Sequence, residues 1–99
     1  MTKKLEKYWF RFVQFSEPTA LNLGCGVSAH SLQDAINIMR EYIFGDNGPP
    51  EIIEQIEQIE LDSLEKNHVL PNIGNVAIRG VWFPQGYETR KYVLNSGNS

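Results

Sequence analysis

The alternation of apolar and polar side chains in the first third of the chain predicts two β-strands. Residues 8–15 are rich in aromatic and β-branched side chains on both faces, which is typical of a central strand. Residues 20–29 alternate Leu, Cys and Val with small residues that include Gly24 and Gly26. Glycine within a strand allows another element to approach closely. The short polar connection at 16–20 predicts that the two strands form a hairpin.

The clearest helix signal follows directly. Ser31 is an N-cap candidate, and Asp34 lies three residues later, as the acidic residue of a capping box does. Apolar side chains then recur at i, i+3, i+4 and i+7, which gives the helix one apolar stripe. Gly45 and the Pro49-Pro50 pair end the pattern. We therefore predict one main helix that begins after Ser31 and ends before Gly45.

The second half of the chain has a less regular pattern. The isoleucines of residues 51–58 fit both helix and strand, and we expect a short helix or irregular turn that passes into a strand near 57–62. Residues 63–72 predict a structured loop with one helical turn. Alternation over residues 75–83 predicts a further strand, and residues 92–94 predict a short edge strand.

Together these elements predict a small two-layer α+β domain, with a mostly antiparallel sheet and one main helix packed on one face. A chain of 99 residues suits a single domain over 1–99, with an ordered core at about 8–94 and frayed ends. No segment resembles a secretory leader or a membrane span, and a lone cysteine suits a reducing compartment. We expect a cytoplasmic protein with no membrane partner.

Charge is unevenly distributed. The net charge is −3, and six of the 12 acidic residues lie within residues 51–65. A nucleic-acid partner is not expected, because phosphate binding needs a basic surface. The acidic segment is either a solvated face or a docking surface for a basic protein. The binding residues that we predict are its acids and two nearby side chains: Glu54, Glu57, Glu60, Asp62, Glu65, Arg79 and Trp82.

Two of these side chains have a second interpretation. Arg79 is the one charge on a predicted strand that is otherwise apolar, so it either pairs with an acid from 57–65 or binds an anionic ligand. The aromatic side chains of Trp9, Trp82 and Phe83 would serve as interface anchors only if they are exposed.

The reactive side chains form no convincing catalytic set. Cys25 is either a small core side chain or a nucleophile activated by His68 or His30. These three residues lack the number and spacing of zinc ligands, and Gly24-x-Gly26 lacks the rest of a phosphate-binding motif. We therefore expect no metal and no cofactor. A small hydrolase or transferase that uses Cys25 and His68 is the alternative.

The segment Asn67-His68-Val69-Leu70-Pro71-Asn72 predicts a locked loop. A loop that contains Pro must satisfy its remaining backbone groups, and short polar side chains do this through local hydrogen bonds. A binding or catalytic role for His68 is the alternative. The residues that we expect to lock the loop are Asn67, His68, Pro71 and Asn72.

Three motifs together resemble a family of short bacterial proteins. They are CGVxA at 25–29, LxxNHVLPN at 64–72 and RGVWFP at 79–84, and the similarity spans about residues 8–86. That family has no established activity, so the resemblance implies no catalytic residue. In size and charge alone, the chain is also similar to the immunity proteins that neutralise toxins.

The function that we predict is a non-enzymatic protein-binding domain, most specifically an immunity-type protein that binds a basic toxin domain. A structural homodimer that pairs through a sheet edge is a further hypothesis.

Overall fold

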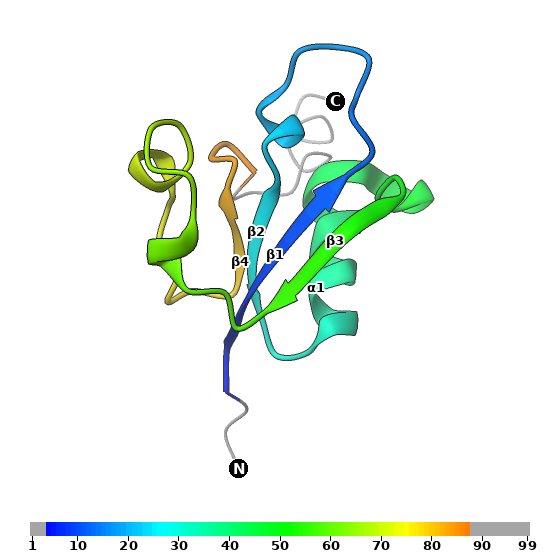
Figure 1. Cartoon of the computed structure of the whole chain (residues 1–99). Coiled ribbons are helices and arrows are strands. Elements are labelled where there is room, and N and C mark those ends of the chain that lie inside the picture. Colours follow the sequence, from blue (N-terminus) through cyan, green and yellow to red (C-terminus); the bar gives the residue numbers. More distant parts are fainter. Residues whose placement is uncertain (1–3, 88–99) are drawn as a thin grey trace, which may run out of the picture.

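A computed structural model describes residues 4–87 of the chain. Its four strands form one antiparallel sheet of order β3-β1-β2-β4, and one main helix covers one face (Figure 1). The predicted two-layer α+β fold is confirmed. The strand predicted at 92–94 lies outside the described residues. The elements are β1 (Glu6–Phe12), β2 (Cys25–Ala29), α1 (Leu32–Met39), β3 (Ile52–Glu57) and β4 (Gly80–Phe83).

Strand β1 is central, as its two apolar faces predict. It pairs with β2 on one side and β3 on the other. Tyr8, Phe10 and Phe12 are buried on the side of α1, whereas Trp9 belongs to a second apolar cluster. The β1–β2 pairing is antiparallel, as predicted, but a short 3-10 turn at Ala20–Asn22 replaces the start of the predicted second strand.

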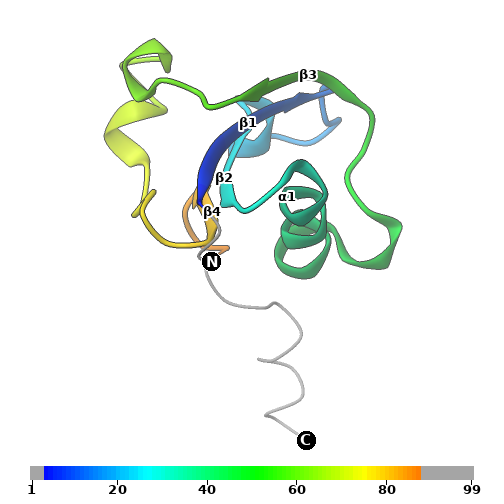
Figure 2. The ribbon, with the colours of Figure 1, turned by 90° about the horizontal axis from the view of Figure 1, so that it is seen from below.

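Helix α1 begins as the sequence predicts. The Ser31 side chain accepts a hydrogen bond from the Asp34 backbone N–H at 3.1 Å, and the Asp34 carboxylate accepts one from the His30 N–H at 3.0 Å. The helix continues as a π-helical turn at Arg40–Phe44 and ends at Gly45, whose φ is +76°. The helix and its extension lie against one side of the curved sheet (Figure 2).

The opposite side of the sheet is covered by the irregular segment between β3 and β4. Figure 2 shows this segment, green to yellow, on the side of the sheet away from α1. Its apolar side chains pack against side chains of β1 and β4, so the sheet has an apolar layer on each face. The buried members of this second cluster are Trp9, Ile59, Leu64, Val69, Trp82 and Phe83.

Two indole rings lie directly on the backbone of Gly24, which precedes β2, and of Gly26 within it. A Cβ added to Gly24 would fall within 3.0 Å of ring atoms of Trp9, and one added to Gly26 would fall within 3.0 Å of ring atoms of Trp82. The rings stack on each other with centroids 6.0 Å apart. The close approach that glycines in this strand predict is therefore present, and tryptophan side chains make it.

Polar groups also enter this layer. The buried Ser28 hydroxyl donates a 2.6 Å hydrogen bond to the carbonyl of Val76, which ties the irregular segment to β2. Among the described residues, the Trp82 indole N–H is the one buried side-chain donor without a hydrogen-bond partner. Such a group costs about 1–3 kcal/mol, so the packing of the Trp82 ring must outweigh that cost.

The prediction for residues 51–62 is wrong, because the strand there occupies Ile52–Glu57. Its pairing with β1 shifts by one residue near Ile53, which is a β-bulge. The shift places Ile52 against the helix-side core and Ile56 in the opposite cluster, although regular alternation would put both on one face. The bulge therefore interrupts the alternation of apolar and polar side chains by which a strand is recognised in a sequence.

The strand predicted at 75–83 is too long, because β4 contains only Gly80–Phe83. The Asn75 side chain accepts a hydrogen bond from the Ala77 N–H at 2.9 Å and forms a local turn instead. The pairing of β4 with β2 also shifts by one residue, so Trp82 and Phe83 both belong to the second cluster.

The contact between Gly26 and Trp82 gives a first prediction. Gly26→Val should destabilise the fold by about 2–3 kcal/mol, because its Cβ would fall 2.4 Å from ring atoms of the buried Trp82. Urea denaturation followed by far-UV circular dichroism measures this loss. Gly74→Ala is the control: its Cβ would meet only ordinary contacts of 3.6 Å and more, so we expect a change below about 1 kcal/mol. Equal losses in both variants would contradict the packing argument.

Candidate functional site

The larger of two cavities near the predicted binding residues is a groove between the sheet and the irregular segment. It has a volume of about 490 Å³ and is open to solvent. Trp9 of β1 and Ile56 of β3 contribute the sheet side, and Leu23 adds an exposed apolar side chain. The opposite wall comes from the segment between β3 and β4 and includes Ile59, Ser63, Leu64, Glu65 and Val69.

An ion pair lies on the sheet side of the groove. Arg11 of β1 and Glu54 of β3 are directly opposite in the register, and the Arg11 Nη1 donates to Glu54 Oε1 at 3.1 Å. Both side chains are about half exposed, so the pair contributes little to stability. No motif in the sequence marks Arg11, although the alternation of its strand places it on the face of Trp9.

The wall of the groove depends on Glu65. Its Oε1 accepts hydrogen bonds from the backbone N–H groups of His68 and Val69, at 3.2 Å for Val69. These bonds, the one from His68 first, lower the pKa of the Glu65 carboxyl group, because they favour its charged form. The side chain of Val69 is thereby held in the buried cluster. Glu65 is therefore part of the loop structure as well as of the acidic segment.

Local hydrogen bonds hold the loop at 67–72, and a carboxylate accepts several of them. The exposed His68 side chain has its Nδ1 3.4 Å from Glu65 Oε2, and the His68 backbone N–H donates to the same carboxylate. The Asn72 side chain donates to the His68 carbonyl at 2.8 Å, as the prediction requires. Pro71 lies in a short 3-10 turn at Leu70–Asn72, and the Asn67 N–H also bonds to Glu65. The sequence indicated the loop correctly and missed the carboxylate that organises it.

The predicted acidic binding residues are all exposed, whereas the predicted aromatic ones are not. The acidic flank, defined by the carboxylates of residues 51–65, lies along β3 and the segment that follows it. Trp82 is 1% exposed, and Trp9 and Phe83 are also buried. The prediction of Trp82 as a surface anchor is therefore wrong. Gly26 has no side chain, so the Trp82 ring packs against its backbone and is buried in the core. The exposed acids are Glu51, Glu54, Glu57, Glu60, Asp62 and Glu65.

Arg79 forms the predicted ion pair, but with a different acid. Its Nε and Nη2 donate to the two carboxylate oxygens of Asp34 at 3.0 and 2.6 Å. The bond from Arg79 is the main cause that lowers the pKa of Asp34 from 3.8 to about 2. The pair joins the start of α1 to the residue before β4, and it lies away from the acidic flank. Only the fold brings these two residues together.

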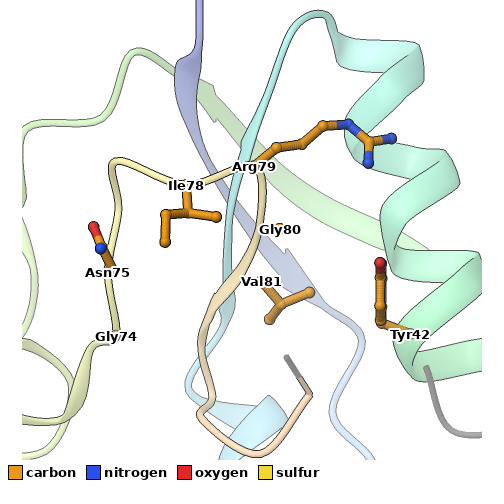
Figure 3. A pocket seen from close by; sticks show the side chains of 7 residues that line it. All are labelled: Tyr42, Gly74, Asn75, Ile78, Arg79, Gly80 and Val81. Atoms are coloured by element: carbon orange, nitrogen blue, oxygen red, sulfur yellow. The ribbon is translucent and has the colours of Figure 1, made fainter. Parts of the chain in front are cut away.

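A second, smaller cavity lies beside this ion pair. It has a volume of about 150 Å³, and Tyr42 on the helix side faces Val81 of β4 across it (Figure 3). Arg79 extends from the cavity margin toward the helix, while Ile78 points to the other side of the chain and is 60% exposed. The backbone of residues 74–75 and of Gly80 completes its lining.

The two residues of the alternative catalytic pair lie in different parts of the fold. Cys25 is fully buried in the helix-side core, and burial raises the pKa of its thiol. His68 is exposed on the loop that covers the other face of the sheet. A nucleophile needs its thiolate form and a base within hydrogen-bond reach, and this arrangement provides neither.

The described part of the chain holds neither a metal-binding cluster nor a helix that could span a membrane. Residues 4–87 contain no group of three or more His, Cys, Asp or Glu side chains arranged to hold a metal ion. Within the same residues, no helix is both long enough and apolar enough to cross a bilayer. No protein-family model, curated protein or solved structure matches the chain.

The pair of Asp34 and Arg79 gives a prediction about pH. The folded pKa of Asp34 is below its ordinary value, so its contribution to stability is complete above about pH 4 and is lost as the pH falls toward 2. A double-mutant cycle of Asp34→Asn and Arg79→Gln should give a coupling of about 1 kcal/mol at pH 7, since both side chains are partly exposed.

Denaturation of the four proteins of this cycle at pH 7 and pH 2 measures the coupling. Arg79→Gln alone should also flatten the loss of stability between about pH 4 and 2, because the pKa of Asp34 then returns toward its unfolded value. A coupling that is unchanged at pH 2 would contradict the assignment.

The burial of Cys25 gives a prediction about thiol reactivity. The native protein should react far more slowly with a thiol reagent such as DTNB than the urea-unfolded protein does, because the thiol is inaccessible and neutral. Ser16→Cys in a Cys25→Ala background is the control: position 16 is exposed, and its thiol should react at once. Rapid native reaction of Cys25 would instead support the hydrolase or transferase hypothesis.

Proposed function

We propose that this chain is a non-enzymatic protein-binding domain that uses its acidic flank to bind a basic partner. The most specific form of the proposal is an immunity-type protein that binds and neutralises a basic toxin domain. The observation that carries it is an acidic flank of six exposed carboxylates, two of which, Glu54 and Glu65, line an open groove with apolar side chains. An interface needs both components, since charges steer association and apolar contacts hold the complex together.

Some of the acidic side chains have structural contacts and others do not serve the fold in this way, which supports this proposal. Asp34 and Glu65 are used within the fold, the first by Arg79 and the second by backbone N–H groups. Glu57, Glu60 and Asp62 are exposed acids on the same flank as Glu54. A cluster of exposed like charges slightly destabilises a small domain, so a role in recognition would account for it.

The alternative hypotheses have less support. A cysteine-dependent enzyme would need Cys25 to leave the core before it could meet His68. A homodimer through a sheet edge would use either β3 or β4, and β4 has only four residues. The other edge strand, β3, carries the like charges of Glu54 and Glu57.

The acidic flank can be tested with the product of the open reading frame beside this gene. Glu57→Gln/Glu60→Gln should lower the association rate constant by about tenfold or more at low ionic strength, with little change in dissociation. The double variant leaves Glu54 in place, because its loss would free Arg11. Stopped-flow measurements at several salt concentrations should show a shallower salt dependence for the variant than for the wild type.

The matched control removes two negative charges elsewhere. Glu17→Gln/Asp46→Asn changes two exposed acids outside residues 51–65, so it should change the association rate much less. If the neighbouring gene product binds and both double variants associate as fast as the wild type, the acidic flank is not the recognition surface.

A further inference from the structure

Strand β3 has an open edge. It lies at the end of the sheet and pairs with β1 on one side, and no described strand lies on its other side. The unpaired N–H and C=O groups of an edge strand can pair with the backbone of another chain. β3 is six residues long, contains no proline and has mostly exposed side chains. Its length and composition therefore permit an additional strand.

The charged side chains of the edge strand itself all have one sign. Glu51 precedes β3, and Glu54 and Glu57 lie within it, while the whole of residues 51–65 contains no lysine or arginine. Glu54 and Glu57 are three residues apart on the side of the bulge where the register is regular, so they project to opposite faces of the sheet. An incoming strand therefore meets carboxylates on either face.

A second copy of this chain is a poor occupant of the edge. Two β3 strands would bring two sets of the same carboxylates to one edge, with no basic side chain in Ile52–Glu57 to compensate. Like charges opposite each other on paired strands are destabilising. The same carboxylates favour a strand that carries lysine or arginine.

We propose that the open edge of β3 binds an extended basic segment of a partner protein, which pairs with β3 as an additional strand. This inference rests on the proposed function and specifies the partner's chemistry: basic residues interspersed with β-branched ones. Side chains of the added strand on the face of Glu54 and Ile56 lie beside the groove, which both residues line. Backbone pairing would supply affinity, and the carboxylates would select the charge.

The experiment uses a fluorescent heptapeptide of sequence Lys-Val-Thr-Lys-Val-Thr-Lys and the full chain. A second peptide carries N-methyl groups on its Val and Thr residues, which keeps the charge and blocks strand pairing along both of its edges. Fluorescence anisotropy at low ionic strength should show binding of the unmodified peptide at least about tenfold tighter than binding of the methylated one. Amide hydrogen exchange followed by NMR should show protection of β3 amides only with the unmodified peptide.

Charge variants separate this inference from the proposed function. Glu51→Gln/Glu57→Gln should weaken binding of both peptides, whereas Glu17→Gln/Asp46→Asn should change it little. Equal affinity for the two peptides, together with sensitivity to Glu51→Gln/Glu57→Gln, would overturn strand addition and leave the acidic flank as a binding surface. Peptide binding that is absent or insensitive to Glu51→Gln/Glu57→Gln would overturn both. Dimerisation of the free chain with protected β3 amides would also overturn the inference.

Discussion

The indole rings of Trp9 and Trp82 lie directly on the backbone where β2 begins, because Gly24 and Gly26 have no side chains to keep them away. This contact allows two large aromatic side chains to be buried against one short strand. It also fixes the distance at which the irregular segment between β3 and β4 packs on the sheet. The unpartnered indole N–H of Trp82 destabilises the fold, but the same ring contributes to a second apolar layer. A sheet with a single helix would otherwise lack this layer.

The groove follows from this second layer. The irregular segment covers the indole rings but leaves Ile56 and one side of Trp9 along an open channel. Its wall keeps its shape because the Glu65 carboxylate binds the backbone of the next turn and Val69 is buried beneath it. A structural carboxylate and the exposed acids of the flank therefore lie within the same short stretch of chain. The structural role of Glu65 and the exposed position of the other acids can be told apart only from the contacts that each carboxylate makes.

The open edge, the groove and the acidic flank meet at Glu54 of β3. Glu54 and Ile56 belong to both the strand and the groove, and Arg11 holds Glu54 on that face. Among the described residues, the pKa values of Cys25 and Asp34 are shifted most, and both residues lie elsewhere. Burial raises the pKa of the thiol, and the ion pair with Arg79 lowers the pKa of the carboxyl group. The arrangement supports recognition by surface contacts more than chemistry at a reactive centre.

The sequence by itself determined the elements whose signals are local. The cap at Ser31, the stop at Gly45 and the alternation of β1 predicted the main helix, the central strand and the α+β class, because capping and periodicity act over a few residues. It also predicted that Gly24 and Gly26 admit a close neighbour, and it gave an ion pair as one of two roles for Arg79.

Only the tertiary structure decided which residues meet. The bulges in β3 and β4 shift side chains between faces, and a shift of one residue is invisible in a pattern with a period of two. Asp34 became the partner of Arg79, and Trp82 entered the core, because the pairing of β4 with β2 places them there. Long-range pairing of strands set these contacts, and no local pattern encodes it.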